Sequence, residues 1–151
     1  MDVWPVYRNS QGVILEDKLG AEGDAVHFFN PADFGVNFVA NSIITSGKMM
    51  KNHPGVVNSF TKALLAAWEA AMDPANEAQV LADIKARDKL ARDDIRKEQL
   101  AVTRTLVKPW ANLPIGHFNT QAWAQTEAIM LTEKQIRKPV NVTQRLIHPR
   151  F

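Results

Sequence analysis

The side chains of this chain that could recognise a ligand are amides and aromatic rings. They are Trp4, Tyr7, Asn9, Asn37, Phe38 and Asn41. A flat ring can stack on a planar ligand, and a neutral amide can both donate and accept the hydrogen bonds that orient it. This set predicts a site for a small planar or polar solute. The alternative, that these aromatic residues simply pack in a core beside strands, stays open.

No local motif predicts catalysis or a metal site. The four histidines, His27, His53, His117 and His148, lie far apart and form no ligand spacing such as His-x-x-x-His. The chain has no cysteine, which excludes disulfides, thiolate metal sites and a cysteine nucleophile. Phosphate-binding glycine loops and the Gly-x-Ser-x-Gly pattern are also missing, and Asp93-Asp94 is interpreted as a helix cap. The residues therefore support no catalytic site, and we expect no metal ion or cofactor.

Composition predicts a single globular domain. The chain has 151 residues, of which 46% are hydrophobic and 23% charged. No apolar run reaches the ~18 residues that a membrane helix needs, and the N-terminus shows no signal-peptide pattern. Acidic residues dominate 1–33, whereas 134–151 holds five bases and no acid. Because no nucleic-acid-binding signature accompanies it, this basic end is interpreted as solvated surface and not as a nucleic-acid contact.

The run Phe34–Ser46 has the pattern of a buried strand. It is rich in β-branched and apolar residues and carries no charge. Two shorter strands are predicted at Asp2–Tyr7, where Pro5 favours an edge position, and at Ala25–Phe29. We interpret 34–46 as a strand that crosses between two lobes and turns its amides toward a ligand. An ordinary core strand with two incidental amides is the alternative.

Helices are predicted over most of the remaining chain. A short one at Gln11–Leu19 precedes Gly20, and Gly47–Asn52 forms an amphipathic turn. Pro54–Met72 is the clearest helix, because its apolar residues recur at i, i+3, i+4 and i+7. The other predicted helices are Ala75–Leu90, Asp94–Val107 and Asn119–Ile136, with a loop at Trp110–Phe118 and an extended tail at Val140–Phe151.

The order of residues from Asn52 to Pro74 resembles one protein family. Asn52-His53-Pro54, then Val57, Phe60, Ala63, Trp68, Ala71 and Asp73-Pro74 are similar to a series found in the no-message-in-thiamine class of substrate-binding proteins of ABC importers. That class covers binders of thiamine-pyrimidine precursors, with sulfonate and taurine binders close by. Upstream, Trp4-Pro5-Val6-Tyr7 and an aromatic-Gly pair before residue 36 are similar too. Downstream, Gly116, Phe118-Asn119 and Trp123 look like the family's pattern near its last helix.

The resemblance implies a partial periplasmic-binding-protein (type II-like) fold of the α/β class, with few N-terminal strands and a helix-rich C-terminal half. Residues 1–33 would end the second lobe, 34–46 would be the hinge strand, and 47–151 would be the helical part of the first lobe. Family members are longer, so the chain corresponds to a C-terminal half. Half a sheet leaves unpaired edges, and we therefore expect self-association.

The resemblance also implies a function. The chain would be the solute-binding component of an ABC importer, with a permease as partner and an extracytoplasmic or periplasmic location for the full-length parent. Gln11 joins the predicted ligand-binding residues, because it stands where many members carry a carboxylate. The alternatives are a pyrimidine synthase and a ligand-sensing fragment without a transport role. The synthase signature is a cysteine cluster at the positions of 36–40, where this chain has Val-Asn-Phe-Val-Ala.

Overall fold

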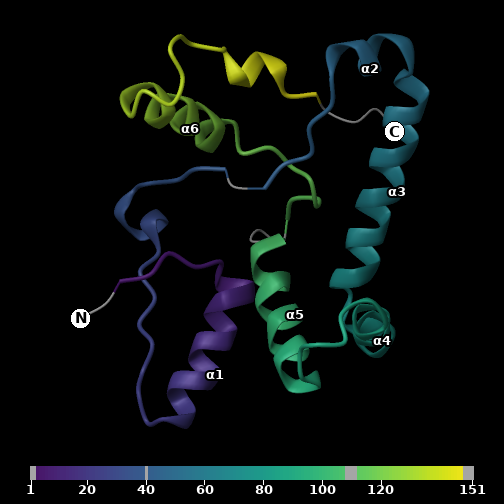
Figure 1. Cartoon of the computed structure of the whole chain (residues 1–151). Helices are drawn as coiled ribbons and strands as arrows, with labels where there is room; N and C mark the ends of the chain where they lie inside the picture. Colours follow the sequence, from purple (N-terminus) through teal and green to yellow (C-terminus); the bar gives the residue numbers. More distant parts are fainter. Residues whose placement is uncertain (1–2, 40, 108–111, 148–151) are drawn as a thin grey trace. The chain divides into compact units, whose positions relative to one another are not determined.

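The computed structural model describes residues 3–39, 41–107 and 112–147, and within these ranges it is built from helices and turns without a β-strand (Figure 1). The longer helices are α1 (Val13–Ala21), α2 (Gly47–Asn52), α3 (Pro54–Met72), α4 (Glu77–Arg87), α5 (Asp93–Val107) and α6 (Thr120–Thr132). Shorter turns are η1 (Arg8–Gly12), η2 (Pro31–Phe34), η3 (Pro74–Asn76) and η4 (Val142–Arg145). The predicted α/β class with N-terminal strands is therefore wrong.

None of the three predicted strands forms, and each segment is irregular or begins or ends in a turn where it is described. In the Asp2–Tyr7 segment, the Tyr7 carbonyl accepts hydrogen bonds from the N–H groups of Ser10 and Gly12, which starts η1. Ala25–Phe29 is irregular. Phe34, the first residue of the predicted strand Phe34–Ser46, ends the turn η2. The residues after it, up to Ser46, are irregular where the structure describes them. A strand needs a neighbouring strand to complete its ladder, and the apolar pattern alone cannot supply one.

Helix boundaries agree better with prediction because their signals are local. The bounds of α2 and α3 are those predicted, and α5 begins one residue early. Ser46 Oγ caps α2 by accepting from the Met49 N–H, and Asn119 Oδ1 caps α6 by accepting from the Ala122 N–H. The helix predicted at Gln11–Leu19 lies instead at 13–21, α4 and α6 are shorter than predicted, and the tail contains η4.

Some predictions fall partly on residues outside the described ranges. These are Asp2 in the first predicted strand, Ala40 in the crossing strand, the first residues of the loop from Trp110, and the end of the tail with His148. Within the described residues, no helix is both long enough and apolar enough to cross a membrane.

The chain divides into two compact units. Unit 1 comprises Met1–Phe28 and Ala66–Ile115, and unit 2 comprises Phe29–Leu65 and Gly116–Phe151. In unit 1, η1 and α1 pack on α5, and α4 packs on the same helix. Its buried apolar side chains are Val13 and Leu100, which are 3% and 5% exposed. In unit 2, η4 packs on α6, whose Ala122 is buried.

The apolar stripe that predicts α3 remains largely exposed within the described structure. Val56, Phe60 and Trp68 are 56%, 58% and 37% exposed. The amphipathic pattern thus identifies the helix correctly, but the described residues provide little cover for its apolar side.

Gly116 is a position in unit 2 that favours glycine. Its φ is +85°, and a Cβ atom there would lie 2.8 Å from Leu65 Cδ2. Gly23 has a similar φ of +84° but open space around it. We expect Gly23→Ala to lower the free energy of unfolding by about 1 kcal/mol, from the left-handed backbone alone, and Gly116→Ala by about 2 kcal/mol. Urea unfolding followed by circular dichroism measures both, and equal losses would mean that the Leu65 contact is unimportant.

Candidate ligand-binding segment

Residues 35–39 are held against α6 by side chains that take the place of a neighbouring strand. The Gln125 amide donates from Nε2 to the Gly35 carbonyl at 2.9 Å and accepts at Oε1 from the Asn37 N–H at 2.6 Å. Thr126 Oγ1 accepts from the Val39 N–H at 2.8 Å and donates to the Ala122 carbonyl. Because alternate N–H groups bond to α6, the extended backbone of this segment is anchored at two-residue intervals.

The anchored segment presents two of the predicted ligand-binding residues. The Phe38 ring is 55% exposed and the Asn37 side chain is also exposed. Asn41, beyond the undescribed position 40, is exposed as well. An exposed ring beside an exposed amide offers one stacking surface and one group that can donate and accept hydrogen bonds.

A stacked pair of phenylalanines precedes this segment. The rings of Phe29 and Phe34 lie 4.4 Å apart between centroids, with an angle of 17° between their planes, and they are 71% and 66% exposed. Asn30 Oδ1 accepts from the Ala32 N–H at the start of η2, and Gly35 ends the turn with a φ of +78°. The sequence pattern predicts that both rings belong to strands, and it does not indicate the pair. The signal was the series Asn-Pro-Ala-Asp-Phe-Gly, which is typical of a capped turn.

Of the predicted residues in unit 1, two make hydrogen bonds within the unit and two present exposed aromatic rings. Asn9 Nδ2 donates to Thr103 Oγ1 on α5 at 3.1 Å, and Gln11 Oε1 accepts from the Tyr7 N–H at 3.1 Å. These two amides therefore hold η1 in place. The Trp4 and Tyr7 side chains are 77% and 57% exposed.

The predicted set thus falls into two groups, with Trp4, Tyr7, Asn9 and Gln11 in unit 1 and Asn37, Phe38 and Asn41 in unit 2. A ligand role for any of them remains a prediction.

Comparison with models of known protein families shows which family this chain belongs to. A family model described as NMT1/THI5 like matches residues 1–78, which is more than half of the chain. The chain belongs to the NMT1/THI5-like family. The resemblance to the no-message-in-thiamine class is therefore confirmed. Comparisons with curated proteins and with solved structures give no match.

The stretch matched by the NMT1/THI5-like model contains all seven predicted ligand-binding residues, the stacked phenylalanines, and α1 to α3. Gln125 and Thr126, which anchor residues 35–39, lie outside it. So do Gly116, Phe118, Asn119 and Trp123, whose resemblance to the family remains a prediction.

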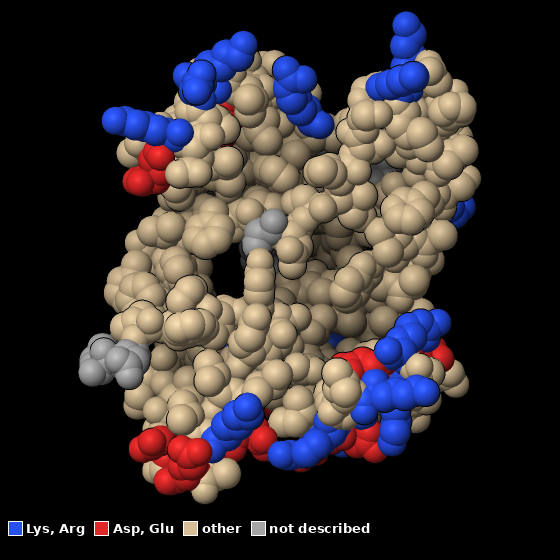
Figure 2. Space-filling view, viewed as in Figure 1, with Lys and Arg blue, Asp and Glu red and all other residues tan. Residues whose placement is uncertain are grey.

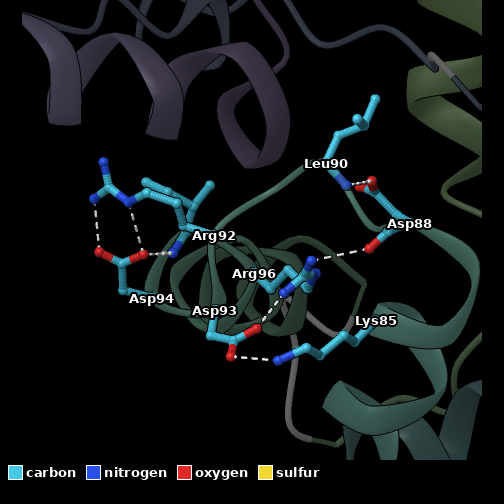
Figure 3. A network of polar contacts seen from close by, with 8 residues as sticks. Lys85, Asp88, Leu90, Arg92, Asp93, Asp94 and Arg96 are labelled. Carbon is cyan, nitrogen blue, oxygen red and sulfur yellow. Dashed lines mark hydrogen bonds and ion pairs between the residues drawn. The ribbon is translucent and has the colours of Figure 1, made fainter.

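The charged side chains of this family member form a network in unit 1 that is built for stability (Figure 3). Asp93 accepts from Lys85 at 2.7 Å and pairs with Arg96, whose guanidinium also donates to the Asp88 carbonyl. Arg96 is only 4% exposed. This cluster joins the C-terminal part of α4 and the loop after it to the first turn of α5.

A second part of the network involves Arg92, which donates to Asp94 and to Asp17 on α1. The hydrogen bond from Arg92 and the Ile95 N–H lower the pKa of Asp94 to about 2. The hydrogen bond from Lys85 lowers the pKa of Asp93. The stability that these carboxylates contribute is present above their ordinary pKa range and is lost as the pH falls through the lowered values. Such paired anions are poor proton donors at neutral pH.

Charges are distributed differently in the two units. Acidic and basic side chains are mixed over α1, α4 and α5, whereas Lys and Arg predominate over α2 and around α6 and η4 (Figure 2). Within the described residues, no group of three His, Cys, Asp or Glu side chains could hold a metal ion.

Removing the Gln125 amide tests whether α6 anchors the candidate segment. We expect Gln125→Ala to speed hydrogen exchange of the Asn37 amide by about fivefold, because a net hydrogen bond is worth about 1 kcal/mol. Nuclear magnetic resonance measures this exchange residue by residue. Gln121→Ala, an exposed position one turn earlier on α6, is the matched control. Unchanged exchange at Asn37 in Gln125→Ala would show that the anchor is not formed in solution.

Proposed function

We propose that this chain is the ligand-recognising part of a solute-binding protein for a small heteroaromatic compound, such as a thiamine-pyrimidine precursor, or for a sulfonate. The observation that carries the proposal is the NMT1/THI5-like match over residues 1–78, which contains every predicted ligand-binding residue. The exposed rings of Phe29, Phe34 and Phe38 support it, because aromatic faces suit a planar ligand. In a longer parent protein the proposed partner is an ABC-importer permease, and the proposed location is extracytoplasmic.

Titration calorimetry with a thiamine-pyrimidine precursor, taurine and an alkanesulfonate tests this function. It should be run on this chain and on a longer form extended upstream. We expect heat of binding for one of these compounds, weakened several-fold by Phe38→Ala. Phe60→Ala, at a phenylalanine on α3 with a similar exposure of 58%, is the matched control and should bind normally. If neither form binds any of the three compounds, the proposal is wrong.

A pyrimidine synthase is the second candidate, and a ligand-sensing fragment is the third. The synthase signature is a cysteine cluster at the positions of residues 36–40, and this chain has no cysteine anywhere. The binding role is therefore favoured over the enzyme. A product assay with the longer form would distinguish them, since turnover of substrate is expected only from the synthase. A sensor would bind the solute without forming a complex with a permease.

We also propose that the chain self-associates. The exposed apolar side chains of the 36–46 segment, including Ile43 and Ile44 at 58% and 89%, are candidates for this contact.

Analytical ultracentrifugation over a range of concentrations tests self-association. We expect dimers or larger species at high concentration. The double variant Ile43→Lys with Ile44→Lys should shift the chain toward monomer, because it places charges on the exposed segment. A wild-type chain that stays monomeric at high concentration would contradict the proposal.

A further inference from the structure

A single carboxylate on α6 binds three consecutive backbone N–H groups of the segment that follows the helix. Glu127 Oε1 accepts from the N–H of Val140 at 2.6 Å and of Asn141 at 2.9 Å, and Oε2 accepts from the N–H of Val142 at 2.8 Å. Three neighbouring N–H groups can converge because Asn141 adopts the left-handed conformation, with φ 54° and ψ 53°. The backbone thus forms a concave anion-binding site that Glu127 fills.

These bonds dominate the attachment of the segment. Among the described residues, every hydrogen bond between 137–147 and α6 ends on Glu127. Two further hydrogen bonds lie within the segment: Arg145 Nε donates to the Val140 carbonyl, and the Gln144 N–H donates to the Asn141 carbonyl. Apolar cover is modest, since Val142 is half-buried and Val140 is 40% exposed. Figure 1 shows the segment with η4, in yellow, following α6, on which η4 packs.

We propose that Glu127 is an anionic latch, which holds residues 140–146 against α6 and releases them when its carboxylate is neutralised. An ionised carboxylate only accepts hydrogen bonds, so it matches three donors. A protonated carboxyl group carries an O–H, which is itself a donor and would face one of these backbone N–H donors. Release would uncover the side of α6 beneath η4 and free a segment that bears Arg145.

The direction of the pH effect follows from the same contacts. The N–H groups of Val142, Val140 and Asn141 lower the pKa of Glu127, against an opposing effect of partial burial. The latch is therefore fully engaged above the ordinary glutamate range and opens as the pH falls through the lowered value. The charged groups on these elements are Glu133 at the end of α6, and Lys134, Arg137, Lys138 and Arg145 after it.

Hydrogen exchange of the full chain, expressed as protection factors, tests the latch. In Glu127→Gln we expect the amides of 140–142 to lose at least tenfold in protection at neutral pH, because charge-assisted hydrogen bonds are about twice as strong as neutral ones. The amides of α6 should keep their protection. Glu133→Gln, the same change at an exposed carboxylate six residues later, should leave 140–142 unchanged. In the wild type, protection at 140–142 should be lost as the pH falls below the ordinary glutamate range, before that of α6.

Two results would overturn the proposal. One is equal protection at 140–142 in Glu127→Gln and the wild type. The other is an equal loss of protection across α6 in Glu127→Gln, which would mean that the residue supports the helix as a whole rather than latching the segment.

Discussion

Replacing Leu100 by alanine is expected to lower the free energy of unfolding by about 2–5 kcal/mol. Leu100 is 5% exposed and lies on α5, the helix on which η1, α1 and α4 pack. Shortening the Leu100 side chain to alanine removes buried apolar surface and leaves a cavity. The surrounding helices cannot readily close this cavity, because ion pairs hold them in place. Because the described part of the chain buries few apolar side chains, each of them carries a large share of the stability of unit 1.

The matched control is Leu106→Ala, the same change on the same helix at a residue that is 53% exposed. It should cost about 1 kcal/mol or less. Urea unfolding monitored by circular dichroism at the helical signal measures both variants. Equal losses for Leu100 and Leu106 would show that α5 does not pack in solution as it does in the structure.

The second large effect is expected at Arg96, where Arg96→Ala should cost about 3 kcal/mol. This guanidinium is 4% exposed, pairs with Asp93 and donates to the Asp88 carbonyl (Figure 3). Alanine leaves both acceptors without this donor and removes the packing of the long side-chain stem. Unfolding by urea at neutral pH gives the measurement.

Two further variants separate the causes. Arg92→Ala removes ion pairs of a 60% exposed side chain and should shift the unfolding midpoint much less than Arg96→Ala, since solvent screens such pairs. Arg96→Met retains the stem but not the charge. A loss in Arg96→Met close to that in Arg96→Ala would assign the effect to the hydrogen bonds. A larger loss in Arg92→Ala than in Arg96→Ala would contradict the prediction.

The sequence alone determined the helices whose signals lie within a few residues. Ser46 and Asn119 cap the helices they precede, and Pro54 begins α3 where predicted. Capping, proline geometry and amphipathic periodicity act over one or two turns, so they can be recognised without knowledge of the rest of the chain. The family was recognised for a related reason, because its pattern runs through α3 and the turn that follows.

Only the tertiary structure decided what happened to the strand-like segments. Phe34–Ser46 has strand-forming residues, yet a ladder requires a partner, and here Gln125 and Thr126, nearly ninety residues later, supply the acceptors for Asn37 and Val39. The same holds for the division of the predicted ligand-binding residues between two units, and for Glu127, which appears in sequence as an ordinary helical glutamate. Contacts between distant segments depend on how the whole chain packs, so a local sequence pattern does not predict them.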